Sequence, residues 1–585
     1  MRFAVLSVGG AFLARYGGQS TDARRSGKSS SASSNDSADG EWMQRARKLA
    51  NQRAAQFRKE RGAQPVAPAQ WRRKRKGEKG NESDNVNFRE AARGYDDLPG
   101  RRVDPANDEP EMTATAGDGL WRVDMDNLSE EDWQSQWTMA NEEWNVVKKD
   151  VKKNAPGPME ALMGFEDSGL RRVSPEIAAG MLKIVADKAK ANRTDREEMT
   201  GIRRDSRVAH LIGTCVAAAR RGSDALSPKS VSNAAWALAV IAGERSNSAE
   251  MEVLSDRASQ MIDSMSPRQT ADLAWALASC RHASTPVFQA LDIRFASDLG
   301  LQKYSPFDLS TLAWAFAHLG NDGSGFVDGL NTWFTEGAVV EETVEDDDVR
   351  AALTATASKK AQSFTPQTLV ATAWGLTVMG GDALGSFSFK QIWTEIGRKG
   401  VEYSDDSSDS SDDSHSSQPV KLGAWGGKHL NQIHQVIVSV DALGGAGKLG
   451  LPELPKELVA AADNAWAAQR RPPVTSWYQR DVASILAYMG EKHEEEAFCA
   501  GYRVDLLVLE WTGTSSAVAV EVDGPSHFAR NDHSVKLGQT KLKHRQLAAL
   551  GYTVVSVPVA DWEYLETSEE KVEYLRGGFE EASKA

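Results

Sequence analysis

Apolar residues recur at helical spacing through the middle of the chain, and the pattern occurs four times. Each copy begins with Ser or Thr followed by Pro, and each carries a Trp at one fixed place. A Ser or Thr N-cap followed by Pro at the first helical position starts a helix without losing a hydrogen bond. Helices are therefore predicted at residues 227–242 (SPKSVSNAAWALAVIA), 266–281 (SPRQTADLAWALASCR), 305–320 (SPFDLSTLAWAFAHLG) and 365–380 (TPQTLVATAWGLTVMG).

The copies recur with a nearly constant period. Trp236, Trp275 and Trp314 are 39 residues apart, and Trp374 follows 60 residues later. A second apolar segment follows each copy, so each repeat is predicted to hold two helices. A degenerate copy lies at 429–443 (HLNQIHQVIVSVDAL), and an earlier one is predicted to have its second helix at 207–221. Paired helices at a fixed period predict an α-solenoid, in which stacked repeats bury one another's apolar faces.

Charge is segregated along the chain, so the net charge of −13 does not exclude a polyanionic partner. Acidic residues concentrate in two blocks at 339–348 and 403–417, which we interpret as insertions into the repeats. A basic stretch lies near the N-terminus at 72–79 (RRKRKGEK). The first 21 residues contain Arg and no acid, which favours an organelle transit peptide. A disordered tail and a secretory signal are the alternatives.

The domain organisation predicted from these patterns has five segments. Residues 1–110 are a transit peptide and a disordered basic region, and residues 111–204 are a helical lead-in. Residues 205–470 form the helical repeats, with acidic insertions at 336–350 and 403–420. Residues 476–567 form a small α/β domain, and residues 568–585 are a C-terminal tail.

The repeat pattern resembles that of octotricopeptide repeats and of the related helical repeats of FAST-kinase-like proteins. The resemblance is carried by P-x-x-L-x-x-x-x-W-A-L, best matched at residues 305–319, and it covers about residues 205–450. It implies selective binding of single-stranded RNA. The residues six and three before each Trp lie one turn apart on the first helix and are mostly polar, as a modular base code requires. The RNA-binding candidates are Ser230, Asn233, Gln269, Asp272, Asp308, Thr311, His429 and Gln432. A solvated helix face is the alternative interpretation, and the tryptophans themselves are predicted to belong to the core.

The C-terminal region changes character. Helices are predicted at 476–490 and 540–550, and strands at 502–510 (YRVDLLVLE), 517–522 (AVAVEV) and 553–557 (TVVSV). The order α, β, β, α, β predicts a mixed α/β unit. The stretch from Glu521 to Trp562, with Asp523, His527 and Gly551 within it, resembles a RAP domain. Since RAP domains are similar to very-short-patch-repair endonucleases, this resemblance implies a restriction-endonuclease fold of the PD-(D/E)xK class and a role in organellar RNA processing.

The same residues carry candidate chemistry. Asp505 and Glu521 are predicted at facing positions of neighbouring strands, where they and Asp523 suit Mg²⁺ and the activation of water for phosphodiester attack. His527 suits proton transfer near neutral pH. A nuclease of this class would carry lysine where the chain has Asp523, and Lys541 is the candidate substitute. Phosphate contacts are predicted for Lys541, Lys543 and Arg545.

The leading prediction is an organellar RNA-binding protein that acts in RNA processing, in the stability of mRNA or rRNA, or in translation. It would work in the mitochondrial matrix or the chloroplast stroma, with single-stranded RNA as partner and ribonucleoprotein or ribosome-associated proteins as further candidates. The alternatives are a Mg²⁺-dependent endoribonuclease and a protein-binding scaffold, and no other cofactor is predicted. The three cysteines are widely spaced, which predicts buried thiols. No run of apolar residues reaches the roughly 20 needed to cross a bilayer.

Overall fold

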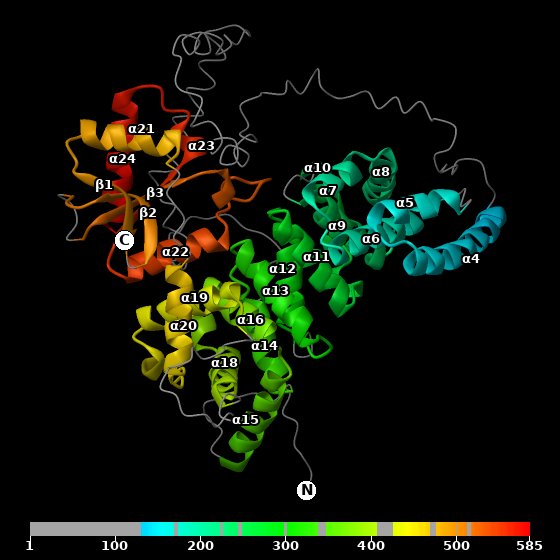
Figure 1. Ribbon diagram of the computed structural model, residues 1–585, viewed down its shortest axis with the longest axis horizontal. Helices are drawn as coiled ribbons and strands as arrows, with labels where there is room; N and C mark the ends of the chain where they lie inside the picture. Colours follow the sequence, from blue (N-terminus) through cyan, green and yellow to red (C-terminus); the bar gives the residue numbers. More distant parts are fainter. Residues whose placement is uncertain are drawn as a thin grey trace, which may run out of the picture.

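The computed structural model describes residues 130–584, apart from gaps at 169–172, 223–225, 244–247, 298–300, 337–346, 406–424, 469–474, 500 and 512–515. The predicted transit peptide and basic region lie outside the described residues, as does most of both acidic blocks. The described chain is mostly helical, with one small mixed sheet near the C-terminus (Figure 1).

The repeats form two rows of helices, and consecutive helices of a row pack side by side. The first row holds the helices that start at Ser/Thr-Pro and their equivalents: α6 (Pro175–Ala191), α9 (Pro228–Ala242), α11 (Pro267–Ser279), α13 (Pro306–His318), α16 (Pro366–Met379) and α19 (Gly427–Ala442). The second row holds α8 (Ser206–Arg221), α10 (Ser248–Ser259), α12 (Thr285–Phe295), α14 (Ser324–Phe334), α18 (Phe387–Asp405) and α20 (Lys456–Ala467). The prediction of paired-helix repeats is confirmed.

The helices begin where the sequence signals predict. Ser227, Ser266, Ser305 and Thr365 are N-caps, and each side chain accepts a hydrogen bond from the amide three residues on. Ser174 does the same for α6, so the row includes one more first helix than the tryptophan pattern indicates. Before it lie α4 (Glu130–Asn154) and α5 (Pro158–Asp167), and α7 (Arg196–Arg204) precedes α8.

One continuous apolar core runs through the repeats from Trp144 to Ala462. Trp236 and Trp374 are buried, while Trp275 and Trp314 are half-buried and pack against the core. The tryptophans are therefore core residues, as predicted. The insertion near the first acidic block contains α15 (Asp347–Gln362), which packs against α14 and α18, and α17 (Asp382–Gly385) lies just before α18. The three cysteines are buried free thiols.

The C-terminal domain is a four-stranded sheet with helices on both faces. Its strands β1 (His493–Cys499), β2 (Tyr502–Val508), β3 (Val518–Asp523) and β4 (Thr553–Pro558) pair in that order, antiparallel except for the parallel pair β3–β4. The helix α22 (Gly538–Ala549) connects the two parallel strands. The helices α21 (Trp477–Tyr488) and α24 (Ser568–Ala582) pack on the other face, and the short α23 (Val559–Trp562) follows β4.

Two features of this domain differ from the predictions. β1 was not predicted, because its run of glutamates (HEEEAFC) lacks strict alternation; charged side chains are common on edge strands, where they discourage further pairing. The residues expected to form a C-terminal tail form α24 instead, and its Leu575 and Phe579 are buried under the sheet.

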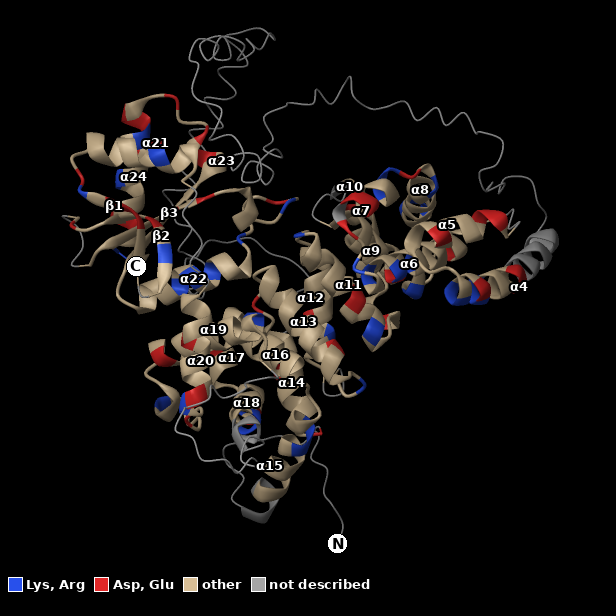
Figure 2. Ribbon diagram, in the orientation of Figure 1, with Lys and Arg blue, Asp and Glu red and all other residues tan. Residues whose placement is uncertain are grey.

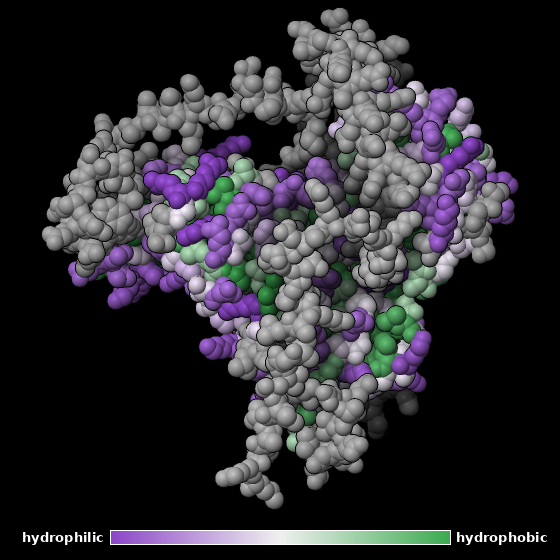
Figure 3. Space-filling model, turned by 180° about the vertical axis from the view of Figure 1, so that it is seen from behind, coloured by the Kyte–Doolittle hydropathy of each residue, from purple (hydrophilic) through white to green (hydrophobic). Residues whose placement is uncertain are grey.

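The surface of the described residues is mixed in character. Seen from behind, hydrophilic and hydrophobic residues alternate over it, and the hydrophobic ones gather in small separate patches (Figure 3). Within the described ranges, no helix combines the length and apolar character that a membrane crossing requires.

Candidate nucleic-acid interface and carboxylate cluster

The residues six before each Trp occupy position N3, the third residue of a first helix. Gln269 and Ser266 form a capping box, in which each side chain bonds the other residue's main-chain N–H, and Asp308 and Ser305 do the same. Ser230 lies within hydrogen-bond reach of Glu176 on α6 and is buried. The polar character of these candidates thus has a structural cause, and their role in reading bases stays a prediction.

The residues three before each Trp occupy position N6 and lie on a more open face. Asn233, Thr311 and Gln432 are half-buried. Asp272 is 9% exposed, and burial raises its pKa even though Arg268 pairs with it. In the degenerate copy, the candidate at N3 is His429, which is half-buried, and burial lowers its pKa.

A row of equivalent residues runs along the first helices beside the N6 positions. This tryptophan ladder consists of Lys183, Trp236, Trp275, Trp314, Trp374 and Gln435. The rings of Trp236 and Trp275 lie 6.0 Å apart, and Trp374 donates a hydrogen bond of 2.8 Å to Gln435. At the other end, the Lys183 ammonium lies 3.5 Å from the Trp236 ring centroid, in cation–π contact.

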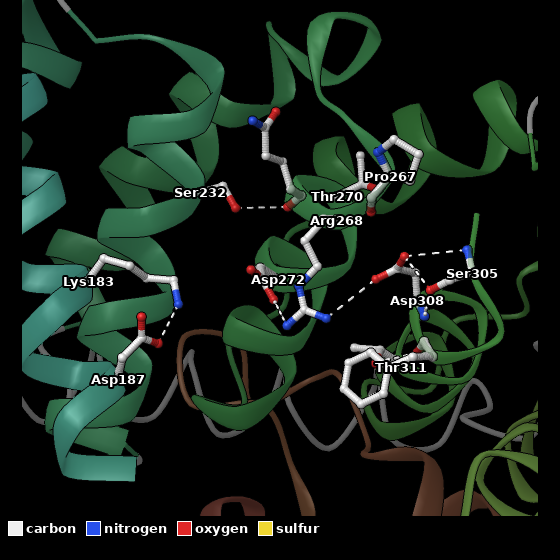
Figure 4. A network of polar contacts seen from close by, with 12 residues as sticks. Lys183, Asp187, Ser232, Pro267, Arg268, Thr270, Asp272, Ser305, Asp308 and Thr311 are labelled. Carbon is white, nitrogen blue, oxygen red and sulfur yellow. Dashed lines mark hydrogen bonds and ion pairs between the residues drawn. The ribbon is translucent and has the colours of Figure 1, made fainter. Parts of the chain in front are cut away.

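Cations are concentrated beside this end of the ladder. Lys190 lies 4.4 Å from the ring centroid of Trp275, and burial together with the nearby charges of Lys183 and Arg268 lowers its pKa. Arg268 links two repeats: it pairs with Asp272 on its own helix at 2.8 Å and with Asp308 on α13 at 3.5 Å. Figure 4 shows Lys183 on α6, Arg268 with Asp272 on α11, and Asp308 on α13, following one another across the repeats. Cations grouped on one face of a protein attract the phosphates of a nucleic acid.

The three carboxylates of the C-terminal domain are held by different elements. The paired residues of β2 and β3 run from Leu506 with Val520 to Val508 with Val518, and Asp505 and Glu521 are the next residues beyond this stretch. The Asp505 carboxylate accepts hydrogen bonds from the Val522 main-chain N–H at 2.7 Å and from Gln479 of α21 at 2.5 Å. The Asp505 side chain therefore links the end of the β2–β3 pair to α21.

Glu521 points toward α22, where it pairs with Lys543 at 2.7 Å. Its side chain is 2% exposed, and burial raises its pKa to about 8 although the lysine opposes the shift. One of its carboxylate oxygens, Oε1, is buried without a hydrogen-bond partner. Lys543 was predicted to contact phosphate; here its ammonium pairs with the buried carboxyl group of Glu521.

Asp523 is surrounded by two histidines. His527 Nδ1 lies 2.9 Å from Asp523 Oδ1, His544 Nε2 lies 3.7 Å from Oδ2, and Ser556 donates a hydrogen bond to the same carboxylate. Burial raises the pKa of Asp523, but its contacts with His527 and His544 outweigh that effect and lower it below the usual range. Burial lowers the pKa of His544 to about 4, whereas the contact with Asp523 overcomes burial and raises that of His527.

These carboxylates do not form the predicted Mg²⁺ site. Within the stretches of chain that the structure describes, no three His, Cys, Asp or Glu side chains converge so as to hold a metal ion. Asp505 is committed to a main-chain N–H and to Gln479, Glu521 to Lys543, and Asp523 to histidines. The donor set does not fit the ion, and we derive no step through it.

The basic helix α22 lies between the sheet and the repeats (Figure 2). Its Leu547 packs with the sheet, while its Leu542 belongs to the core of the repeats. Lys541 donates a hydrogen bond of 3.0 Å to the carbonyl oxygen of Gly320, just after α13. Arg545 donates to the carbonyl oxygens of Val378, at 3.2 Å, and Thr377, near the end of α16. Both predicted phosphate ligands thus cap helix ends, where cations are favoured by the helix dipole.

Further contacts extend the interface between the C-terminal domain and the repeats over four repeats. The Arg530 main-chain N–H donates to Arg281 O after α11, at 2.8 Å, and Asn531 exchanges two hydrogen bonds with Ala283. Gln546 donates to Gln435 O and to Ser439 Oγ on α19, both at 2.6 Å. These residues were not predicted to contact the repeats, because nothing in the local pattern distinguishes them from solvated polar residues.

The comparisons with known proteins identify the C-terminal domain. Residues 520–577 match the model of the RAP domain, so the chain carries a RAP domain, as predicted. The chain is 27% identical over 418 residues to "RAP domain-containing protein, chloroplastic" of Oryza sativa subsp. japonica, an alignment covering 69% of this chain and 60% of the rice protein. It is 34% identical over 86 residues to "FAST kinase domain-containing protein 3, mitochondrial" of Bos taurus, covering 15% of this chain and 12% of the bovine protein.

Proposed function

We propose that this protein binds single-stranded RNA in a chloroplast or a mitochondrion and acts there in RNA processing, RNA stability or translation. The repeats bind the RNA, and the RAP domain fixes the positions of neighbouring repeats relative to one another. We expect the fold of the RAP domain to be of restriction-endonuclease type. The organelle is inferred from the names of the two relatives, one chloroplastic and one mitochondrial, and from the Arg-containing, acid-free N-terminus.

The observation that carries the proposal is the track along the first helices. Half-buried polar side chains at N6 lie next to the tryptophan ladder, with Lys183, Lys190 and Arg268 beside it. The polar side chains supply hydrogen-bonding groups for bases, and the cations supply affinity for phosphate. Repetition at one place in each helix pair offers a separate contact for each successive nucleotide.

The test is crosslinking of the tagged full-length protein to RNA in cells, followed by sequencing of the recovered RNA. The proposal predicts sharp footprints on one or a few organellar transcripts. A footprint that ends at a cleavage site, with the cleavage lost in Asp505→Ala/Glu521→Ala, would replace binding alone with an endoribonuclease. Recovery of no RNA above background would reject the proposal and leave a protein-binding scaffold.

A further inference from the structure

Among the first three helical residues of each first helix from α9 to α19, the one with an exposed side chain is N2, which follows the residue at N1 and precedes the residue at N3. The N2 residues of the repeats from α9 to α19 are all exposed: Lys229, Arg268, Phe307, Gln367 and Lys428. The following residue, N3, is committed to the helix start or to a neighbouring helix in the capped repeats. N2 is therefore the position whose side chain is available to a ligand.

Position N2 shares a helix face with N6, because residues four apart lie one above the other. The pair Arg268 and Asp272 shows this contact directly, at 2.8 Å. The N6 residue in turn lies one turn before the Trp of the ladder. Each repeat from α9 to α16 thus places N2 and N6 on one stripe, above a ladder Trp that belongs to the core.

The N2 side chains also reach from one repeat to the next. The guanidinium of Arg268 lies 4.9 Å from the ring centroid of Phe307, the N2 residue of α13, and its ion pair with Asp308 crosses the same boundary. The side chain of Phe307 is 52% exposed. Such exposure is unusual for a large aromatic residue on a helix whose apolar face is already buried in the core. The N2 side chains of α11 and α13 therefore meet across a repeat boundary.

We propose that N2, together with N6, makes the base-selective contacts of each repeat, and that N3 does not. This inference rests on the proposed binding of single-stranded RNA. The residue types suit base recognition. The ring of Phe307 can stack on a base, and the amide of Gln367 offers both a donor and an acceptor. The three cations, Lys229, Arg268 and Lys428, can bind phosphates or the acceptor atoms of bases. The variation among these five residues gives each repeat a different preference.

The experiment is selection of bound sequences from a pool of random single-stranded RNA 20-mers by the purified full-length protein. Wild type is compared with the N2 variants Arg268→Gln and Phe307→Arg and with the N3 variants Gln269→Glu and Thr368→Ser, which keep their capping groups. We expect each N2 variant to change the preferred base at one or two adjacent positions of the selected motif. The N3 variants should select the wild-type motif.

Affinity for the wild-type motif gives a second measurement. Phe307→Ala should weaken it by ~5- to 100-fold, as loss of one base–aromatic stack does, with an unchanged melting temperature. A motif changed by the N3 variants and unaltered by the N2 variants would overturn the inference while leaving RNA binding intact. Failure of wild type to enrich any sequence would overturn the proposed function and this inference with it.

Discussion

The guanidinium of Arg545 donates a hydrogen bond of 3.2 Å to the main-chain carbonyl of Val378, so a side chain of the RAP domain completes the end of a repeat helix. It bonds the neighbouring carbonyl of Thr377 as well. In the preceding repeat, Lys541 has the same role at Gly320. The RAP domain is thus seated on the ends of the first helices, and its position depends on their spacing.

Removing the Arg545 side chain should weaken the docking of the two domains. Arg545→Ala leaves two carbonyl oxygens without their main donor, which costs ~1 to 3 kcal/mol when such groups are buried. The urea midpoint of unfolding, followed by tryptophan fluorescence, should fall accordingly. Arg576→Ala, which removes an exposed arginine of α24, is the matched control. Equal midpoints for the two variants would show that the caps contribute nothing.

Gly538 marks the closest approach of the RAP domain to the repeats. A Cβ atom there would lie 1.8 Å from the carbonyl oxygen of Ala317, a main-chain atom that cannot swing aside. Gly538→Ala should therefore push α22 off α13 and destabilise the protein by ~1 to 3 kcal/mol, as overpacking of a tight contact does. Gly524→Ala, whose Cβ would meet no atom within 4 Å, should leave the thermal melting temperature nearly unchanged. Equal melting temperatures for Gly538→Ala and Gly524→Ala would mean that the interface between α22 and α13 is not rigid.

The repeat helices were predictable because their signals are local. A capping Ser or Thr, a Pro and an apolar period lie within one turn or two of each helix start. The same local signal at Ser174 and Pro175 starts α6, the first helix of the copy whose second helix was predicted at 207–221, but this first helix was not placed because Lys183 stands where the later copies have Trp. The capping boxes, too, were present in the sequence, as Ser266 with Gln269 illustrates.

The roles of the basic residues on α22 were not predictable from the sequence. A phosphate and a helix-terminal carbonyl attract the same cations, so Lys541 and Arg545 fit either partner equally well. The choice is made by contacts between residues more than 150 positions apart, such as Arg545 with Val378. Likewise, the positions of Asp505 and Glu521 on neighbouring strands could be predicted from the sequence, but the hydrogen bond from Gln479 of α21 to Asp505 depends on the packing of that helix on the sheet.

The capping role of N3 can be tested separately from RNA binding. Gln269→Ala removes the acceptor that bonds the Ser266 main-chain N–H at 2.9 Å and should destabilise the protein by ~0.5 to 1 kcal/mol. Gln269→Glu keeps an acceptor and places a negative charge at a helix N-terminus, so it should match or exceed wild-type stability. Differential scanning calorimetry measures both melting temperatures. A Glu variant as unstable as the Ala variant would contradict the capping box.

The burial of Glu521 predicts a pH dependence of stability. Its pKa rises on folding from an ordinary 4.5 to about 8, so between these values the folded protein binds more protons than the unfolded chain. The contribution of Glu521 is therefore fully present below pH 4.5 and is lost as the pH rises toward about 8. Glu521→Gln removes this titration, and its free energy of unfolding, measured by urea denaturation from pH 5 to pH 8, should decline less steeply with pH than that of wild type. Parallel profiles would mean that the Lys543 ammonium keeps Glu521 ionised in the folded protein.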